Sequence, residues 1–153
     1  MGIEKDIQQT AFRNEFQKLG INLIYTANWL NEKIGQVLAT EKITQQQYNI
    51  LRILRGSECP LSTLKIRERM LDKMSDTSRI VDRLITKGLV EKTACLSDKR
   101  LVDITLSKNG IQLLEKLDKF NDQIDAILKG IHEKEASTVN QILDKLREVG
   151  AKK

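Results

Sequence analysis

The feature that most constrains the fold is a change in the spacing of apolar residues after Gly88. On both sides of the stretch 89–106, apolar side chains recur every three or four residues, which is the period of one helix face. Within that stretch, two short β-type runs, 89–93 and 101–106, flank a polar turn and predict a β-hairpin. The sequence therefore predicts a mainly α protein that carries one small β-hairpin.

The helical segments can be bounded by their capping residues. Thr44, with Gln47 three residues later, has the pattern of a capping box. Ser75 and Ser107 are expected to cap two further helices, and Gly88 to end one of them. We expect helices at about 7–38, 44–55, 61–71, 75–87, 107–131 and 133–149.

Several classes of protein fit the sequence poorly. No apolar run approaches the ~20 residues that a membrane-spanning helix needs, and the N-terminus lacks the pattern of a secretion signal, so we expect a cytoplasmic protein. With two cysteines and one histidine, His132, neither a disulfide scaffold nor a transition-metal site is expected; a carboxylate site for a hard cation stays open. No Gly-rich phosphate loop or Ser-His-acid set occurs, so we expect no cofactor and no enzyme.

The excess positive charge lies in the middle of the chain. The net charge is +5, and residues 44–108 hold 13 Lys and Arg against eight Asp and Glu, whereas the flanking segments are balanced. A basic segment between neutral helices is typical of a phosphate-binding module. Uneven distribution by chance is the alternative.

A short helix, a tight turn, a second capped helix and a hairpin form the winged helix-turn-helix arrangement, in which the second helix enters the major groove of DNA. On this helix Thr77, Ile80, Val81 and Leu84 are predicted to face the core. The opposite face carries Ser75, Arg79, Asp82 and Thr86, flanked by Ser78 and Arg83.

Arg79 is the side chain best suited to read a base, since a guanidinium can bind guanine O6 and N7 together. Ser75 and Ser78 can bind phosphates or base edges near the positive end of the helix dipole. We expect Asp82 to pair with Arg83 or another arginine. The alternative for this face is a solvated polar surface.

The predicted hairpin turn contains Asp98, Lys99 and Arg100. A basic turn can insert arginine into a narrow minor groove, and Asp98 is placed to brace the side chain of Arg100. A charged turn that only aids solubility is the alternative.

The stretch 61–110 resembles the MarR family of bacterial regulators. The matching pieces are Ile80–Leu84, Lys87–Lys92, Asp98–Arg100 and Leu106–Gly110, at the spacing the family has.

The resemblance implies a homodimer that binds a two-fold site on double-stranded DNA and is released by a small ligand or an oxidant. It implies one MarR-like domain over 1–153, with dimerisation helices at 4–40 and 108–150 and a DNA-binding lobe at 44–107. Carried over by position, Ser75, Thr77, Ser78 and Arg79 match the start of the recognition helix, and Asp98 and Arg100 match the wing.

Three questions stay open from sequence. Tyr25, Trp29 and Tyr48 are candidates to line a pocket for a small-molecule effector, or they pack in the core. Cys95 is a candidate redox sensor, which would make the chain a thiol-based regulator. A helical adaptor that binds a protein partner is the alternative function, although it leaves the basic hairpin unexplained.

Overall fold

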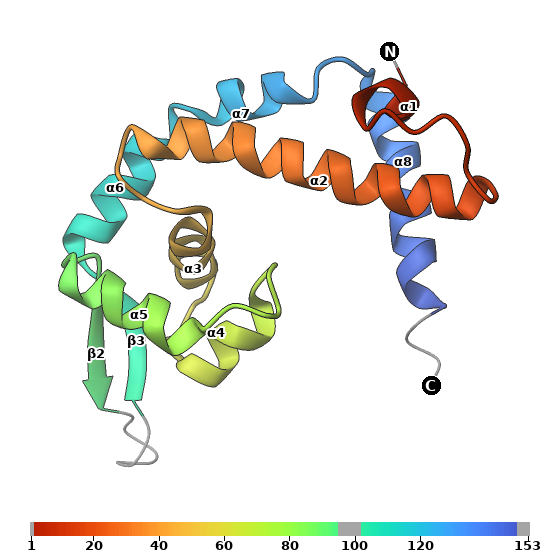
Figure 1. Ribbon diagram of the computed structural model, residues 1–153. Coiled ribbons are helices and arrows are strands. Elements are labelled where there is room, and N and C mark those ends of the chain that lie inside the picture. The colour runs from red at the N-terminus through yellow and green to blue at the C-terminus, as the bar shows by residue number, and fades with distance from the viewer. Residues whose placement is uncertain (1, 95–101, 150–153) are drawn as a thin grey trace. The chain divides into compact units, whose positions relative to one another are not determined.

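The computed structural model describes residues 2–94 and 102–149. It divides into two compact units, one ending at Phe120 and the other beginning at Asn121, and each is described by itself. The larger unit holds the helices α1 to α6 and the sheet, and the smaller unit holds α7 and α8 (Figure 1).

The helix predicted over 7–38 begins later than expected, and a separate short helix precedes it. α1 (Ile3–Asp6) ends before Gln8, whose φ of 54° lies outside the right-handed helical region. α2 (Glu15–Ala39) begins after a non-helical connection. Asn14 caps α2 by accepting a hydrogen bond from the backbone N–H of Gln17 at 2.9 Å. The Gln17 side chain in turn accepts one from the Arg13 N–H at 2.7 Å. This reciprocal cap fixes a helix start that apolar periodicity alone did not reveal.

α3 (Gln45–Arg55), α4 (Thr63–Arg69) and α5 (Thr77–Thr86) follow, and α6 (Lys108–Asp118) comes after the hairpin. The predicted capping box at the start of α3 is confirmed, with Thr44 Oγ1 accepting from Gln47 N–H and Gln47 Oε1 accepting from Thr44 N–H, both at 3.1 Å. The predicted helix over 107–131 is wrong in its length, because it breaks after Asp118 and α7 begins at Asn121.

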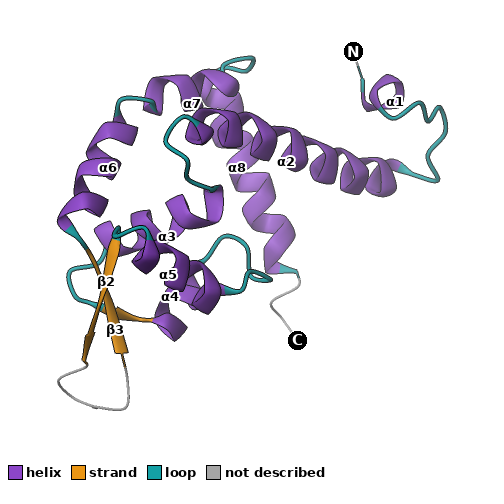
Figure 2. Ribbon diagram, turned by 60° about the vertical axis from the view of Figure 1, so that its left-hand side comes forward, coloured by secondary structure: helices purple, strands orange, loops and turns teal. Residues whose placement is uncertain are grey.

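The sheet is antiparallel and has three strands, β1 (Leu61–Ser62), β2 (Val90–Ala94) and β3 (Val102–Leu106), in the order β1-β3-β2 (Figure 2). The predicted hairpin is β2 and β3, whose register pairs Val90 with Leu106. β1 was not predicted as a strand; it pairs Leu61 with Ile104 and is the third strand of the sheet.

One apolar core lies between α3, α4, α5, α6 and the sheet. Its fully buried side chains come from each of these elements and from the end of α2, and each contributes roughly 1.5–3 kcal/mol of burial free energy. They are Leu38, Ile50, Leu51, Ile66, Met70, Val81, Leu84, Val90, Ile104, Leu114 and Leu117. This core fixes α5 against the hairpin, with the outer side of α5 left at the surface (Figure 1).

The long helices outside this core leave many apolar side chains exposed. Leu38 is the one buried residue of the 25-residue α2, and neither α7 (Asn121–Ile127) nor α8 (Glu133–Glu148) buries any residue. None of the helices in the described part of the chain is long and apolar enough to cross a membrane.

Candidate nucleic-acid interface

The start of α5 is set by Asp76 rather than by Ser75, which corrects the expected cap. Asp76 Oδ1 accepts a hydrogen bond from the backbone N–H of Arg79 at 3.2 Å. Ser75 is 9% exposed, and its hydroxyl donates to the backbone carbonyl of Asp72 at 2.8 Å. Ser75 therefore stabilises the turn before α5, and little of its side chain is exposed there.

The turn between α4 and α5 is held by polar side chains of α3. Asn49 Oδ1 accepts from the Leu71 N–H at 2.9 Å, and the Gln46 side-chain amide donates to Asp72 Oδ2 at 3.0 Å. The other carboxylate oxygen of Asp72 accepts from the Met74 N–H at 3.0 Å. These contacts position α5, and sequence reasoning did not find them; an aspartate that accepts a bond from the residue two positions later is a recognisable turn signal.

The side of α5 that faces the core is the one predicted from the sequence. Thr77, Ile80, Val81 and Leu84 are all buried, with exposures of 3%, 7%, 1% and 0%. Thr77, predicted both for the core side and as a DNA contact, lies on the core side and offers little surface for such a contact. Ser78, Arg79, Asp82, Arg83 and Thr86 are exposed on the other side.

The charges on the outer side of α5 are partly paired. Asp82 forms an ion pair with Lys92 of β2, at 3.4 Å, instead of the expected pair with an arginine. Neither Arg79 nor Arg83 forms an ion pair with another described residue. Two guanidinium groups are therefore exposed and available on this helix.

The junction from the hairpin into α6 explains the segment 106–110. Ser107 caps α6 as predicted, with its Oγ accepting from the Gly110 N–H at 3.0 Å, and the same hydroxyl donates to the Gly88 carbonyl at 2.6 Å. Gly88 has a φ of +70°, a conformation that glycine adopts without strain. A side chain at Gly110 would meet the Leu89 carbonyl oxygen at 2.1 Å. The end of α5, the start of β2 and the start of α6 are thus locked together.

Residues 43–102 match the model of the MarR family. The chain is 26% identical over 136 residues to the multiple antibiotic resistance protein MarR of Escherichia coli, covering 87% of this chain and 93% of that protein. A solved structure of a MarR variant from E. coli with operator DNA has a TM-score of 0.80 at 22% identity, over 90% of this chain and 99% of that one. The BpsR protein of Bordetella bronchiseptica, solved to explain regulation of its DNA binding by 6-hydroxynicotinic acid, has a TM-score of 0.79 at 21% identity, over 90% and 98% of the two chains.

Residues 43–102 of the chain form a MarR-family domain. The chain is therefore a DNA-binding transcription regulator of winged helix-turn-helix fold rather than an enzyme. In this fold α5 takes the position of the second helix of the helix-turn-helix, and β2–β3 takes the position of the wing. Asp98, Lys99 and Arg100, like Cys95, lie outside the described residues.

The candidate effector residues differ in their surroundings. Tyr25 and Trp29 are 41% and 38% exposed on α2, whereas Tyr48 packs against the core from α3. Tyr48 therefore takes part in core packing, and a role for Tyr25 and Trp29 in effector binding stays a prediction. A surface groove lies instead between α4 and the start of α5, lined by Thr63, Leu64, Arg67 and residues 74–78.

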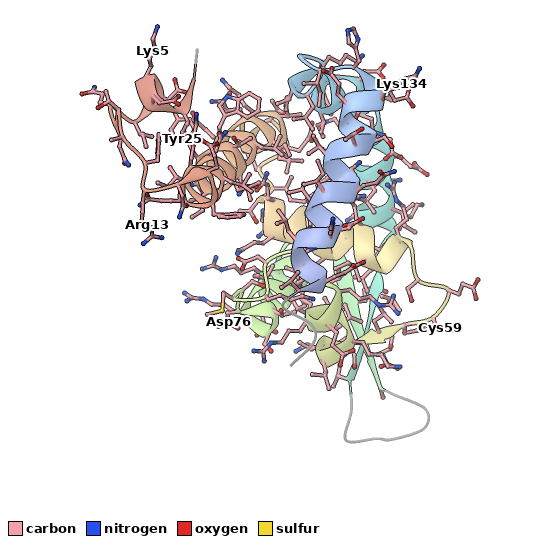
Figure 3. All side chains as sticks on the ribbon, turned by 90° about the vertical axis from the view of Figure 1, so that its right-hand side faces the viewer. Lys5, Arg13, Tyr25, Cys59, Asp76 and Lys134 are labelled. Atoms are coloured by element: carbon pink, nitrogen blue, oxygen red, sulfur yellow. The ribbon has the colours of Figure 1, made fainter. Side chains whose placement is uncertain are left out.

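Cys59 is exposed in the turn before β1, and Figure 3 shows it on the side of the lobe away from Asp76. Among the described residues no three His, Cys, Asp or Glu side chains gather in an arrangement that would hold a metal ion.

Proposed function

We propose that the chain acts as a homodimeric repressor that reads a pseudo-palindromic operator through α5 and is released by a small-molecule effector in the cytoplasm. In this proposal each subunit places α5 in the major groove, with half-sites about one helical turn apart. Occupation of the operator then blocks polymerase.

The observation that carries the proposal is the division of α5 into a buried apolar side and an exposed side with free arginines. Because its buried side is anchored in the core, α5 is held rigidly while Ser78, Arg79 and Arg83 stay accessible. A major groove about 12 Å wide admits one helix, and arginine is the side chain that most often reads guanine. Arg79 lies in the first turn of α5, where recognition helices contact bases.

The wing supplies the second contact in this proposal. β2 and β3 lie next to α5 (Figure 2), and in the sequence Lys99 and Arg100 fall between these two strands. Arg100 is proposed to enter the minor groove, Lys99 to contact phosphate, and Asp98 to brace Arg100.

Dimerisation is supported by the apolar side chains that the single chain leaves exposed. On α2, Phe16 and Ile24 are 84% and 66% exposed, and on α8 Ile142 and Leu146 are 51% and 45% exposed. Large apolar side chains left exposed on a helix mark an interaction site. A second copy of the chain would cover it and would give the two-fold symmetry that a palindromic site needs.

Fluorescence anisotropy tests the proposal, with a labelled duplex from the region upstream of the protein's own gene and a scrambled duplex as control. We expect sequence-selective binding that weakens steeply as salt is raised, since each neutralised phosphate releases counterions. If binding to both duplexes is weak, the next experiment is to select the genomic fragments that the protein binds. If that selection enriches no sequence, the proposal is wrong and the adaptor function gains support.

A further inference from the structure

Asp76 caps α5 with a carboxylate, so the start of this helix carries a negative charge. One of the carboxylate oxygens accepts the Arg79 N–H and closes the first turn of α5. Serine, threonine or asparagine would do the same without a charge. The side chain is exposed, and Figure 3 shows it at the surface of the lobe.

The negative charge of Asp76 is not neutralised within the described part of the chain. Asp82, the other acid on α5, is paired with Lys92, but Asp76 has no ion pair with any residue of 2–94 or 102–149. A free carboxylate at the start of a helix that approaches phosphates weakens binding to every DNA sequence, because like charges repel. Such a charge favours binding only where a hydrogen-bond donor on the DNA meets it.

Base edges in the major groove supply that donor. Cytosine presents the amino group N4 and no acceptor of its own, whereas adenine presents its amino group beside the acceptor N7, and guanine presents acceptors alone. A carboxylate oxygen is therefore matched best by cytosine and repelled by guanine. Because Asp76 Oδ1 is engaged by the helix cap, Oδ2 is the atom left to accept this bond.

We propose that Asp76 is a specificity-determining residue that reads cytosine at one position of each operator half-site. The inference rests on the proposed function, in which α5 lies in the major groove. Asp76 precedes Arg79 by one helical turn, so the two side chains are neighbours on α5. Cytosine read by Asp76 and guanine read by Arg79 consequently occupy nearby base pairs of the same half-site.

The test starts from the unmodified protein and a library of random-sequence duplexes, from which bound molecules are selected and sequenced. The preferred duplex is then compared with versions in which each invariant cytosine is replaced in turn. For the parent, one such replacement should weaken binding by about tenfold, the usual cost of one mismatched pair. Replacement of the other base pairs gives the background for this comparison.

Two variants separate base reading from capping. Asp76→Ser keeps a capping oxygen but is too short to reach a base, so discrimination at that cytosine should fall below about twofold while binding to random DNA strengthens roughly two- to fivefold. Asp76→Asn also keeps the cap, and its amide should move the preference to adenine, which accepts and donates through N7 and N6. Glu115→Gln, at an exposed position of α6, removes the same charge and should change neither quantity. Thermal melts of all four proteins show that the lobe stays folded.

The outcomes are distinguishable. If the parent selects a sequence but both Asp76 variants discriminate that cytosine as the parent does, Asp76 is a cap only and the inference is wrong while the proposed function stands. A selected half-site with no invariant cytosine also overturns the inference. If the parent selects no sequence at all, the proposed function itself fails.

Discussion

Lys87, the residue that follows α5, donates a hydrogen bond to the side-chain oxygen of Gln47 at 3.2 Å. Gln47 is 5% exposed, and the same oxygen accepts the Thr44 N–H in the capping box of α3. The ammonium group of Lys87 also donates to the Lys42 carbonyl oxygen at 2.5 Å, in the turn after α2. One lysine thus ties the end of the recognition helix to the connection between α2 and α3.

Lys87→Met should lower the free energy of unfolding by about 1 kcal/mol, because the Lys42 carbonyl loses this donor and the buried Gln47 oxygen loses one of two. Urea unfolding at a fixed protein concentration measures the change. Lys119→Met, which removes an exposed lysine at the end of α6, serves as the control and should stay within ~0.5 kcal/mol of the parent. Equal stability of the two variants would show that the hydrogen bonds of Lys87 contribute nothing to stability.

Gly110→Ala should destabilise the lobe, because the added Cβ would lie 2.1 Å from the Leu89 carbonyl oxygen and 3.3 Å from the Leu106 side chain. Backbone cannot yield as a flexible side chain can, so we expect a loss of about 1–3 kcal/mol. The midpoint of thermal unfolding measures it. Lys108→Ala in the same turn adds no atom, and its unfolding midpoint should lie close to that of the parent. An equally small change in the midpoint of Gly110→Ala would contradict the proposed clash.

The ion pair between Glu4 of α1 and Lys18 of α2 predicts a pH dependence of the N-terminal segment. The hydrogen bond from Lys18 lowers the pKa of Glu4, and the same bond raises the pKa of Lys18. The contribution of Glu4 is complete above the usual carboxylate pKa and is lost as pH falls through the lowered value. That of Lys18 is complete below its usual pKa and is lost as pH rises through the raised one.

Carboxylate chemical shifts of Glu4, followed by NMR during acid titration, check this prediction. The midpoint should lie below that of an unpaired glutamate, and Lys18→Gln should return it to the ordinary range. An unshifted midpoint in the parent would mean that the pair does not form in solution.

Short-range signals in the sequence predicted the caps at Thr44 and Ser107 and missed those at Asn14 and Asp76. Thr44 and Ser107 bind backbone groups three residues away, so their role can be read from local spacing. Ser75 and Asp76 are both capping residues, and sequence alone could not choose between them; the bond of Ser75 to Asp72 settles the choice. The helix break after Asp118 could not be predicted, because no glycine or proline lies there in the sequence.

The exposed face of α5 could be predicted from the sequence, but the contacts that hold α5 in position could not. Periodicity placed Arg79 outside and Ile80 inside because neighbouring helix positions differ by 100°. The contact of Asn49 with Leu71 spans 22 residues and joins two elements, so no local pattern encodes it. Asp82 likewise pairs with Lys92 across the helix–strand boundary instead of with a neighbour on α5.

Arg79→Ala and Arg100→Ala should affect operator binding in different ways. Loss of a base-reading arginine costs about 1–3 kcal/mol on the preferred operator and relaxes preference at one position. Loss of a wing arginine should weaken binding to all duplexes and reduce the slope of log affinity against log salt by about one. Anisotropy with the selected and scrambled duplexes measures both. Identical effects of the two variants would show that the proposed division of roles is wrong.

Ile142→Glu on α8 should dissociate the proposed homodimer, because a charge would be buried without a partner where the two chains meet. Val139, Ile142 and Leu146 recur at three- and four-residue steps, so they form one apolar stripe on that helix. Sedimentation velocity should show the variant as monomer at concentrations where the parent is a dimer. Asn140→Glu places the same charge off the stripe and should leave the dimer intact.

The same pair of variants connects assembly with operator binding. A monomer reaches one half-site at a time, so Ile142→Glu should lose most of its affinity for a two-site duplex while its weak affinity for an isolated half-site equals that of Asn140→Glu. Such a result would assign the loss to the missing second subunit, since α5 would still read DNA normally. If Ile142→Glu remained dimeric and bound the two-site duplex like the parent, the exposed stripe of α8 would have another use, and the dimer would have to form through other surfaces.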